Sequence, residues 1–108
     1  MWEDRQVGRP GTGADTDLVS KEVPDHLTVC IESISISDLT TAAKIVRVGW
    51  TDGTTNFWII RKTLAAGEYS LSWSGKILLA ERHKIIGRVE SAVAGDNLLL
   101  VSNGYYVD

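Results

Sequence analysis

From residue 16 onward the chain alternates apolar and polar residues with a period of two, and this alternation constrains its fold more than any other feature. Within residues 44–51, for example, Val46, Val48 and Trp50 share one parity while Arg47 has the other. A period of two places successive side chains on opposite faces of a β-strand. Valine, isoleucine and threonine, which favour strands, supply 28 of the 108 residues. The pattern predicts a chain built from strands, with no helix.

Turn-forming residues divide this pattern into about eight short strands. Asp52-Gly53 is the strongest hairpin signal, because type I′ turns need a positive φ at both central residues. We expect strands over residues 17–23, 26–37, 44–51, 55–62, 69–73, 77–79, 84–91 and 98–107. Their number and close spacing favour an antiparallel β-sandwich or barrel.

Two of these strands are candidates for contacts between protein chains. The long strand over 26–37 changes phase, because Val29 and Ile31 are apolar at odd positions whereas Ile34 and Ile36 are apolar at even ones. Such a change indicates a bulge, or a strand that passes from one packing environment to another. We therefore take Ile34 and Ile36 as candidate interface residues.

The strand over 55–62 is apolar on both faces. Phe57 and Ile59 have one parity, and Trp58 and Ile60 have the other. A strand with this pattern is either central in a sandwich or lies at a subunit contact. Phe57, Trp58 and Ile60 are therefore candidate interface residues.

Residues 1–15 differ from the rest of the chain. The stretch from Gly8 to Gly13 is rich in glycine and contains Pro10, and it shows no periodicity. We predict a flexible N-terminal arm over 1–15 and a sandwich domain over 16–108. Trp2 and Arg9 are the arm residues expected to contact a neighbouring subunit.

Composition excludes several classes of protein. The net charge is −3 and the pI is about 5.3, which argues against a nucleic-acid-binding surface. No apolar run is long enough to cross a membrane. The acidic residues after Met1 do not resemble a secretory signal. The single cysteine, Cys30, forms no intrachain disulfide and is expected in the core. We expect a protein made in the cytoplasm that stays there unless a particle carries it out.

Catalytic and metal-binding patterns are not evident in the sequence. His26 and His83 are the only histidines, and neither has a metal-binding spacing or a cysteine cluster beside it. There is no Gly-x-Ser-x-Gly motif and no phosphate-binding loop. A small cupin-like enzyme would need several histidines around a metal. We therefore predict no catalytic residue, no metal, no cofactor and no enzymatic activity.

Four tryptophans leave an alternative open. Strand tryptophans are most often core residues, but tryptophan is also enriched at protein interfaces. Trp50, Trp58 or Trp73 would form a stacking face in a carbohydrate-binding sandwich module, with Asp52 and Asn56 as polar partners. The alternative function is thus a carbohydrate-binding module of a tail fibre or accessory protein.

The succession of strands and turns from residue 16 onward resembles small β-sandwich structural proteins of tailed bacteriophages. The matching features are a short strand ending at Pro24, a long strand with a threonine-rich link, a hairpin, a Gly-Glu turn, a hydrophobic step and a penultimate strand. They lie at residues 16–24, 26–43, 45–61, 64–69, 75–79 and 84–89. The charged connection at 81–84 departs from the Pro/Gly-Asp turn of that group.

This resemblance implies a jelly-roll-like sandwich that is oligomeric, commonly trimeric, and decorates capsids or builds tail parts. The expected function is that of a non-enzymatic capsid decoration, or cement, protein located in the virion. Its expected partners are copies of itself in a homotrimer and the major capsid protein or other virion proteins.

Overall fold

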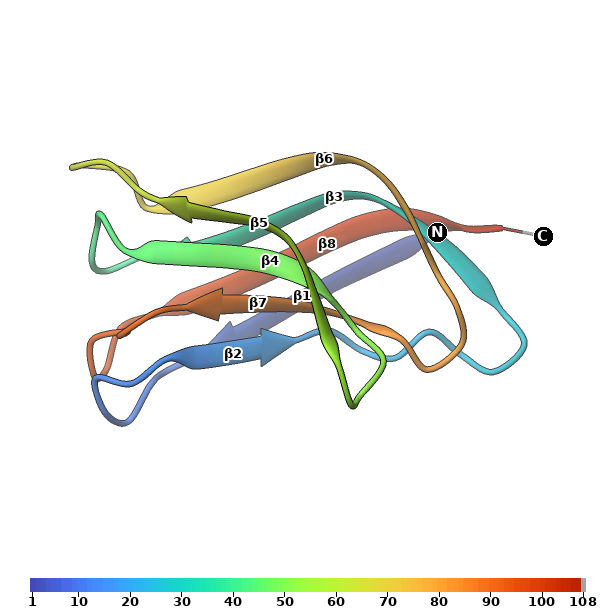
Figure 1. The fold of residues 1–108 in the computed structure, drawn as a ribbon, viewed down its shortest axis with the longest axis horizontal. Helices are drawn as coiled ribbons and strands as arrows, with labels where there is room; N and C mark the ends of the chain where they lie inside the picture. Colours follow the sequence, from blue (N-terminus) through green and yellow to red (C-terminus); the bar gives the residue numbers. More distant parts are fainter. Residues whose placement is uncertain (108) are drawn as a thin grey trace.

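The computed structural model describes residues 1–107 and contains eight strands and no helix in that range (Figure 1). The strands are β1 (Trp2–Gly8), β2 (Thr16–Val19), β3 (Thr28–Asp38), β4 (Ile45–Thr51), β5 (Asn56–Thr63), β6 (Ser70–Leu79), β7 (Lys84–Val89) and β8 (Leu98–Val107). Among these residues there is no helix that is long and apolar enough to cross a membrane.

The strands form two antiparallel four-stranded sheets that pack face to face. One sheet has the order β1-β8-β3-β6 and the other has the order β2-β7-β4-β5. The chain thus pairs β1 with β8, β2 with β7, β3 with β6 and β4 with β5, as one long hairpin would if it were wrapped around a barrel. This is the jelly-roll order, made of two Greek keys. The predicted all-β, jelly-roll-like sandwich of about eight strands is confirmed.

The core lies between the two sheets and is made of aliphatic side chains with one tryptophan. Several strands contribute inward-facing residues at alternate positions, as the sequence periodicity requires, whereas β5 has no buried residue and β1 has only Trp2. The largest fully buried side chains are Trp2, Ile31, Ile34, Ile36, Leu79, Ile85, Leu98, Leu100, Val23, Val29, Val46 and Val48. The sandwich they fill measures 42 × 24 × 21 Å.

A bulge in β3 explains the change of phase in its sequence. The registers of β3 with β6 and with β8 both shift between Ile31 and Ser33. The extra residue keeps both halves of the strand facing inward, so Ile31, Ile34 and Ile36 are all buried. The prediction that Ile34 and Ile36 lie at an interface is therefore wrong, because the bulge places both side chains in the core.

The N-terminal residues also differ from the prediction. Residues 2–8 are not part of a flexible arm, because Trp2–Gly8 forms the edge strand β1 and pairs with β8 over its whole length. Trp2 is completely buried, and its indole nitrogen donates a hydrogen bond of 3.1 Å to the Ser102 hydroxyl. Trp2 is therefore a core residue of this subunit and not a contact to a neighbour. The residues that follow, 9–15, connect β1 to β2.

Two connections between strands differ from those expected from the sequence. The strands expected over 69–73 and 77–79 are one continuous strand, β6, with an irregularity between them. There the Trp73 ring covers Gly75 so closely that a Cβ would lie 2.6 Å from it. The β4–β5 hairpin is present, but its turn spans residues 52–55, and of these only Gly53 has a positive φ. The Asp52 carboxylate accepts hydrogen bonds from the Thr54 and Thr55 amides, so it closes this longer turn.

Candidate interaction surface

Strand β5 is the most exposed apolar element of the molecule. It lies at the edge of its sheet and pairs only with β4, so one side of its backbone has no strand partner. Phe57, Ile59 and Ile60 are exposed to 40%, 38% and 36%, and Ile59 has no partner on β4 because the register shifts there. Phe57, Trp58, Ile59 and Ile60 are called the β5 surface below.

The β5 surface is supported from beneath by aromatic stacking. The Phe57 ring stacks on Trp50 with a centroid separation of 4.2 Å and an angle of 17° between the planes. Trp50 in turn packs against the core and against the His83 ring at 4.9 Å. Offset or stacked aromatic pairs are favourable beyond the area they bury. Phe57 is thus held in a fixed position although it is exposed.

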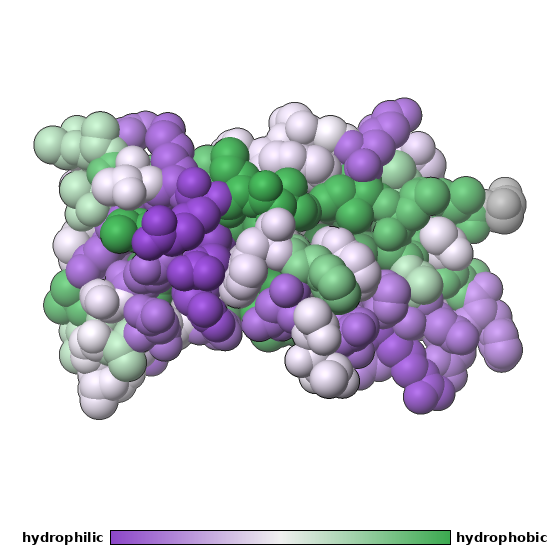
Figure 2. All heavy atoms as spheres, viewed as in Figure 1, coloured by the Kyte–Doolittle hydropathy of each residue, from purple (hydrophilic) through white to green (hydrophobic). Residues whose placement is uncertain are grey.

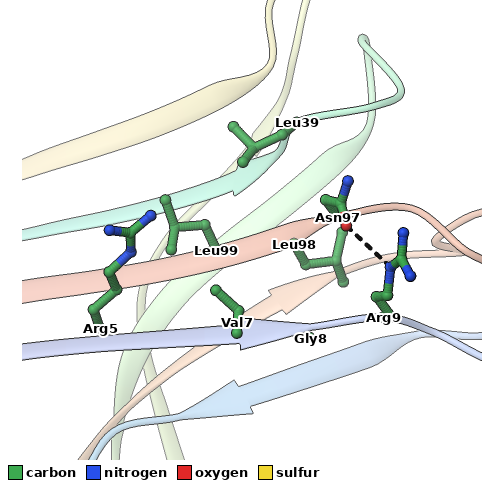
Figure 3. Close-up of a pocket in the computed structure, with 8 residues that line it drawn as sticks. All are labelled: Arg5, Val7, Gly8, Arg9, Leu39, Asn97, Leu98 and Leu99. Atoms are coloured by element: carbon green, nitrogen blue, oxygen red, sulfur yellow. Dashed lines mark hydrogen bonds between the residues drawn. The ribbon is translucent and has the colours of Figure 1, made fainter.

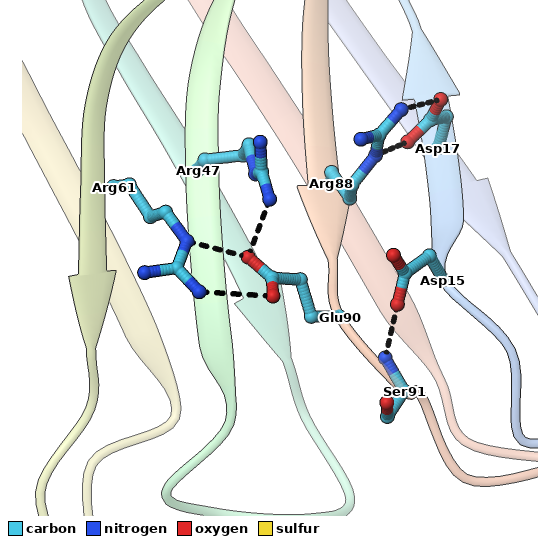
Figure 4. A network of polar contacts seen from close by, with 7 residues as sticks. All are labelled: Asp15, Asp17, Arg47, Arg61, Arg88, Glu90 and Ser91. Carbon is cyan, nitrogen blue, oxygen red and sulfur yellow. Dashed lines mark hydrogen bonds and ion pairs between the residues drawn. The ribbon is translucent and has the colours of Figure 1, made fainter.

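The outer face of the sheet that contains β5 carries a network of charged side chains (Figure 4), and Trp58 of β5 lies beside two of its arginines. The guanidinium carbons of Arg47 and Arg88 lie 5.1 and 5.0 Å from the centre of the Trp58 ring, a cation–π arrangement. Arg88 binds the Asp17 carboxylate through two hydrogen bonds of 2.6 and 3.0 Å. These contacts join β2, β7, β4 and β5 across the outer face of the sheet.

Glu90 is the central anion of this cluster. Its carboxylate accepts hydrogen bonds from Arg61 at 2.7 and 3.1 Å and from Arg47 at 2.7 Å. These bonds, that from Arg61 first, lower the pKa of Glu90 to about 2. Figure 2 shows the hydrophilic residues gathered on this part of the surface, with hydrophobic atoms in a band beside them.

The two cations of β5 itself are neutralised within the subunit. Arg61 is paired with Glu90, and the Lys62 ammonium lies 3.5 Å from the Glu68 carboxylate. The amide of Ala65 and the charge of Lys62 both lower the pKa of Glu68, so the acid is ionised at neutral pH. The β5 surface therefore carries no unpaired charge along its edge.

The structure brings together three of the seven predicted interface residues. Phe57, Trp58 and Ile60 lie within five residues on β5. Trp2, Ile34 and Ile36 are in the core, as described above. Arg9 is exposed at the far end of the other sheet, where its Nε donates a hydrogen bond to Asn97. Ile59 lies between Trp58 and Ile60 in the same apolar run and is also exposed.

The tryptophans do not share a face. Trp50 lies on the same face of β4 as the buried Val46 and Val48 and packs on the core. Trp58 is paired with Gly49 and lies on the outer face. Trp73 lies on β6 in the other sheet and also packs on the core. These three rings therefore do not form one common stacking face.

His83, Asp38 and Asp96 are titratable residues that lie outside the Glu90 cluster. Among residues 1–107 no group of three potential metal ligands is found. His83 accepts a hydrogen bond from the Ala80 amide and stacks on Trp50. Asp38 and Asp96 are a buried carboxyl pair, and the Oδ2 atom of each has no hydrogen-bond partner. Burial, above all, raises the pKa of Asp38, and the neighbouring Asp96 adds to the rise.

Comparison with known proteins adds no family to these observations, since no family model, curated protein or solved structure matches the chain.

Proposed function

We propose that the protein is a non-enzymatic structural protein of a tailed-phage virion, and specifically a homotrimeric capsid decoration protein that adheres through protein–protein contacts. The observation that carries the proposal is the β5 surface, where Phe57, Ile59 and Ile60 are exposed on a strand that has no partner along one edge. Its proposed occupant is a second copy of the chain, placed in the virion beside the major capsid protein.

An exposed apolar strand edge is costly to leave in water. Full burial of a large apolar side chain contributes about 1.5–3 kcal/mol, so covering Phe57, Ile59 and Ile60 supplies roughly 1 kcal/mol for each. Free backbone donors and acceptors on an edge strand also pair readily with another chain. Natural edges are protected by charged side chains, prolines, bulges or a covering segment. Because the cations of β5 are already neutralised, a second copy approaches without repulsion between like charges.

The fold suits an assembly role. Jelly-roll sandwiches occur in viral capsid domains, in lectins and in cupins. A lectin use needs a binding platform, which the separate tryptophans do not supply. A cupin use needs a cluster of metal ligands, and residues 1–107 hold no group of three. The capsid use needs only complementary surfaces, and the β5 surface is one.

Light scattering coupled to size exclusion tests self-association directly. We expect the wild type at micromolar concentration to have a mass of about three times 11.8 kDa. Ile59→Lys puts an unpaired charge on the β5 surface at a position that is exposed in the subunit, so it should yield a folded monomer. Val93→Lys makes the same change at a similarly exposed residue in the turn before β8 and should leave the mass unchanged.

The outcomes separate the parts of the proposal. A wild-type monomer refutes self-association, and a dimer refutes the threefold assembly alone. An oligomer that survives Ile59→Lys shows that another surface joins the copies. Immunogold labelling of phage particles tests the location, since label over the head is expected, and particles without label refute the virion assignment.

A further inference from the structure

A second feature lies on the other sheet, far from β5. A hollow of about 480 Å³ opens on the outer face of β1 and β8 and is lined by eight residues. Figure 3 shows Arg5 and Arg9 on its two sides, with Val7, Leu99 and Leu39 between them. Its lining is therefore an apolar floor bordered by two cations, with no acidic residue.

The floor of the hollow is open to solvent. Val7 is 73% exposed and Leu39 is 54% exposed. Val7 lies opposite Leu99 in the β1–β8 register, so these two side chains stand next to each other on the outer face. An apolar side chain of a ligand would be covered here by Val7, Leu39 and Leu99.

The two arginines differ from every other arginine in the chain. Arg47, Arg61, Arg82 and Arg88 each form an ion pair with a carboxylate. Within residues 1–107, neither Arg5 nor Arg9 has a carboxylate within ion-pair distance. In a chain with a net charge of −3, the two guanidinium groups without a partner border the same hollow.

Hydrogen bonds fix the wall that carries Arg9. The Arg9 Nε donates to the Asn97 side chain at 3.1 Å, which leaves its terminal nitrogens free to bind a ligand. The backbone of Asn97 is itself held in place. Its backbone N–H donates a hydrogen bond to the Thr40 hydroxyl at 3.0 Å, and its backbone carbonyl accepts one from the Leu39 N–H at 2.8 Å. The same residue thus positions a cation and a floor residue, so little ordering is left for binding.

We propose that this hollow binds an extended acidic segment of a partner protein, with an apolar side chain on the floor and a carboxylate on each arginine. Arg5 lies in β1 and Arg9 directly follows it, and four residues of extended chain span about 13 Å. An extended ligand covers the same span with an acidic residue, a spacer, an apolar residue, a spacer and a second acidic residue. Arginine binds carboxylates through two parallel hydrogen bonds, which suits this recognition.

The proposal does not depend on self-association through β5, because the two surfaces lie on different sheets. A binding experiment in the monomeric Ile59→Lys variant therefore tests the hollow alone. The probe is a blocked seven-residue peptide with a central leucine and a glutamate two positions to either side. The readout is the set of backbone amide shifts in nitrogen–proton correlation spectra of the labelled protein.

We expect the peptide to shift the amides of Val7, Gly8 and Leu99 and to leave those of β5 unmoved. Replacing both glutamates by glutamine should weaken binding about fivefold, the ratio expected for two exposed ion pairs. Arg5→Gln combined with Arg9→Gln should weaken it equally. Arg82→Gln, which removes an exposed arginine that is paired with Asp25, should have no effect.

Three results would overturn the proposal. The first is an absence of shifts at the hollow up to millimolar peptide. The second is equal binding of the glutamine peptide, which would leave the arginines without a role. The third is an equal response to inorganic phosphate at matched ionic strength, because the hollow would then be a simple anion site and its apolar floor would contribute nothing.

Discussion

The Trp2→Ala substitution tests whether the N-terminal strand belongs to the sandwich. Trp2 is completely buried against the core, and its indole nitrogen donates to Ser102, which is also completely buried. Truncating a buried tryptophan to alanine costs about 3–5 kcal/mol. Loss of the hydrogen bond to Ser102 adds about 1 kcal/mol, because the hydroxyl is left without its partner. A single domain has only about 5–15 kcal/mol of stability, so the change removes a large part of it.

Urea unfolding followed by far-ultraviolet circular dichroism measures this loss. With a slope of about 1–1.5 kcal/mol per molar urea, the summed loss of about 4–6 kcal/mol should lower the midpoint by roughly 3–6 M. Arg5→Ala is the matched control, since it lies on the same strand with an exposed side chain and should change stability by less than about 0.5 kcal/mol. Trp2→Phe and Ser102→Ala, alone and together, isolate the hydrogen bond as a coupling of about 1 kcal/mol.

The reasoning fails if Trp2→Ala behaves like Arg5→Ala. Such a result would mean that residues 2–8 contribute no packing, and the original expectation of a loose arm would return. A large loss of stability for Trp2→Ala without any coupling to Ser102 would support the place of β1 in the sandwich and contradict only the hydrogen bond.

Three further substitutions address charge and packing. The first two are read from urea unfolding between pH 2 and pH 8, and the third is read from soluble expression and far-ultraviolet circular dichroism. Glu90 has a pKa lowered to about 2, so its contribution is present above the unfolded pKa near 4.5 and is lost as the pH falls towards 2. Because Arg61 is half exposed, we expect the unfolding free energy of the wild type to fall by about 1–2 kcal/mol over that pH range. Glu90→Gln should not show this fall. The pKa of Asp38 is raised in the folded protein, so the free energy of unfolding falls as the pH rises through that pKa. Asp38→Asn lacks this ionisation, so its stability relative to the wild type should increase towards neutral pH. Gly104→Val should fail to fold, because a Cβ there would overlap the Cys30 carbonyl; a soluble, folded variant would contradict the β3–β8 register.

The sequence predicted the fold well where side chains alternate cleanly. The hairpin at 51–56 and the bulge in β3 both followed from the local pattern. It failed for β1, where Glu3, Asp4, Arg5 and Gln6 show no apolar alternation. That strand is specified by pairing with β8 and by one buried side chain, Trp2, and both are contacts that a local pattern does not contain.

The surfaces were predictable only in part. The apolar run at 57–60 was visible in the sequence, but its position at an edge depends on the jelly-roll order. The hollow beside Arg9 was not predictable, because Leu39 and Leu99 come from segments 60 residues apart in the chain. The distinction between the arginines is likewise a property of the folded chain, since it depends on which carboxylates lie nearby.

The pairing of the first strand with the last has a consequence for folding. Trp2 and Ser102, which share a hydrogen bond between β1 and β8, are 100 positions apart in the chain. Contacts of such long sequence separation slow folding. Until β8 pairs with β1, the chain holds an unburied tryptophan and an unpaired strand, and this form is the one most exposed to aggregation and to chaperones.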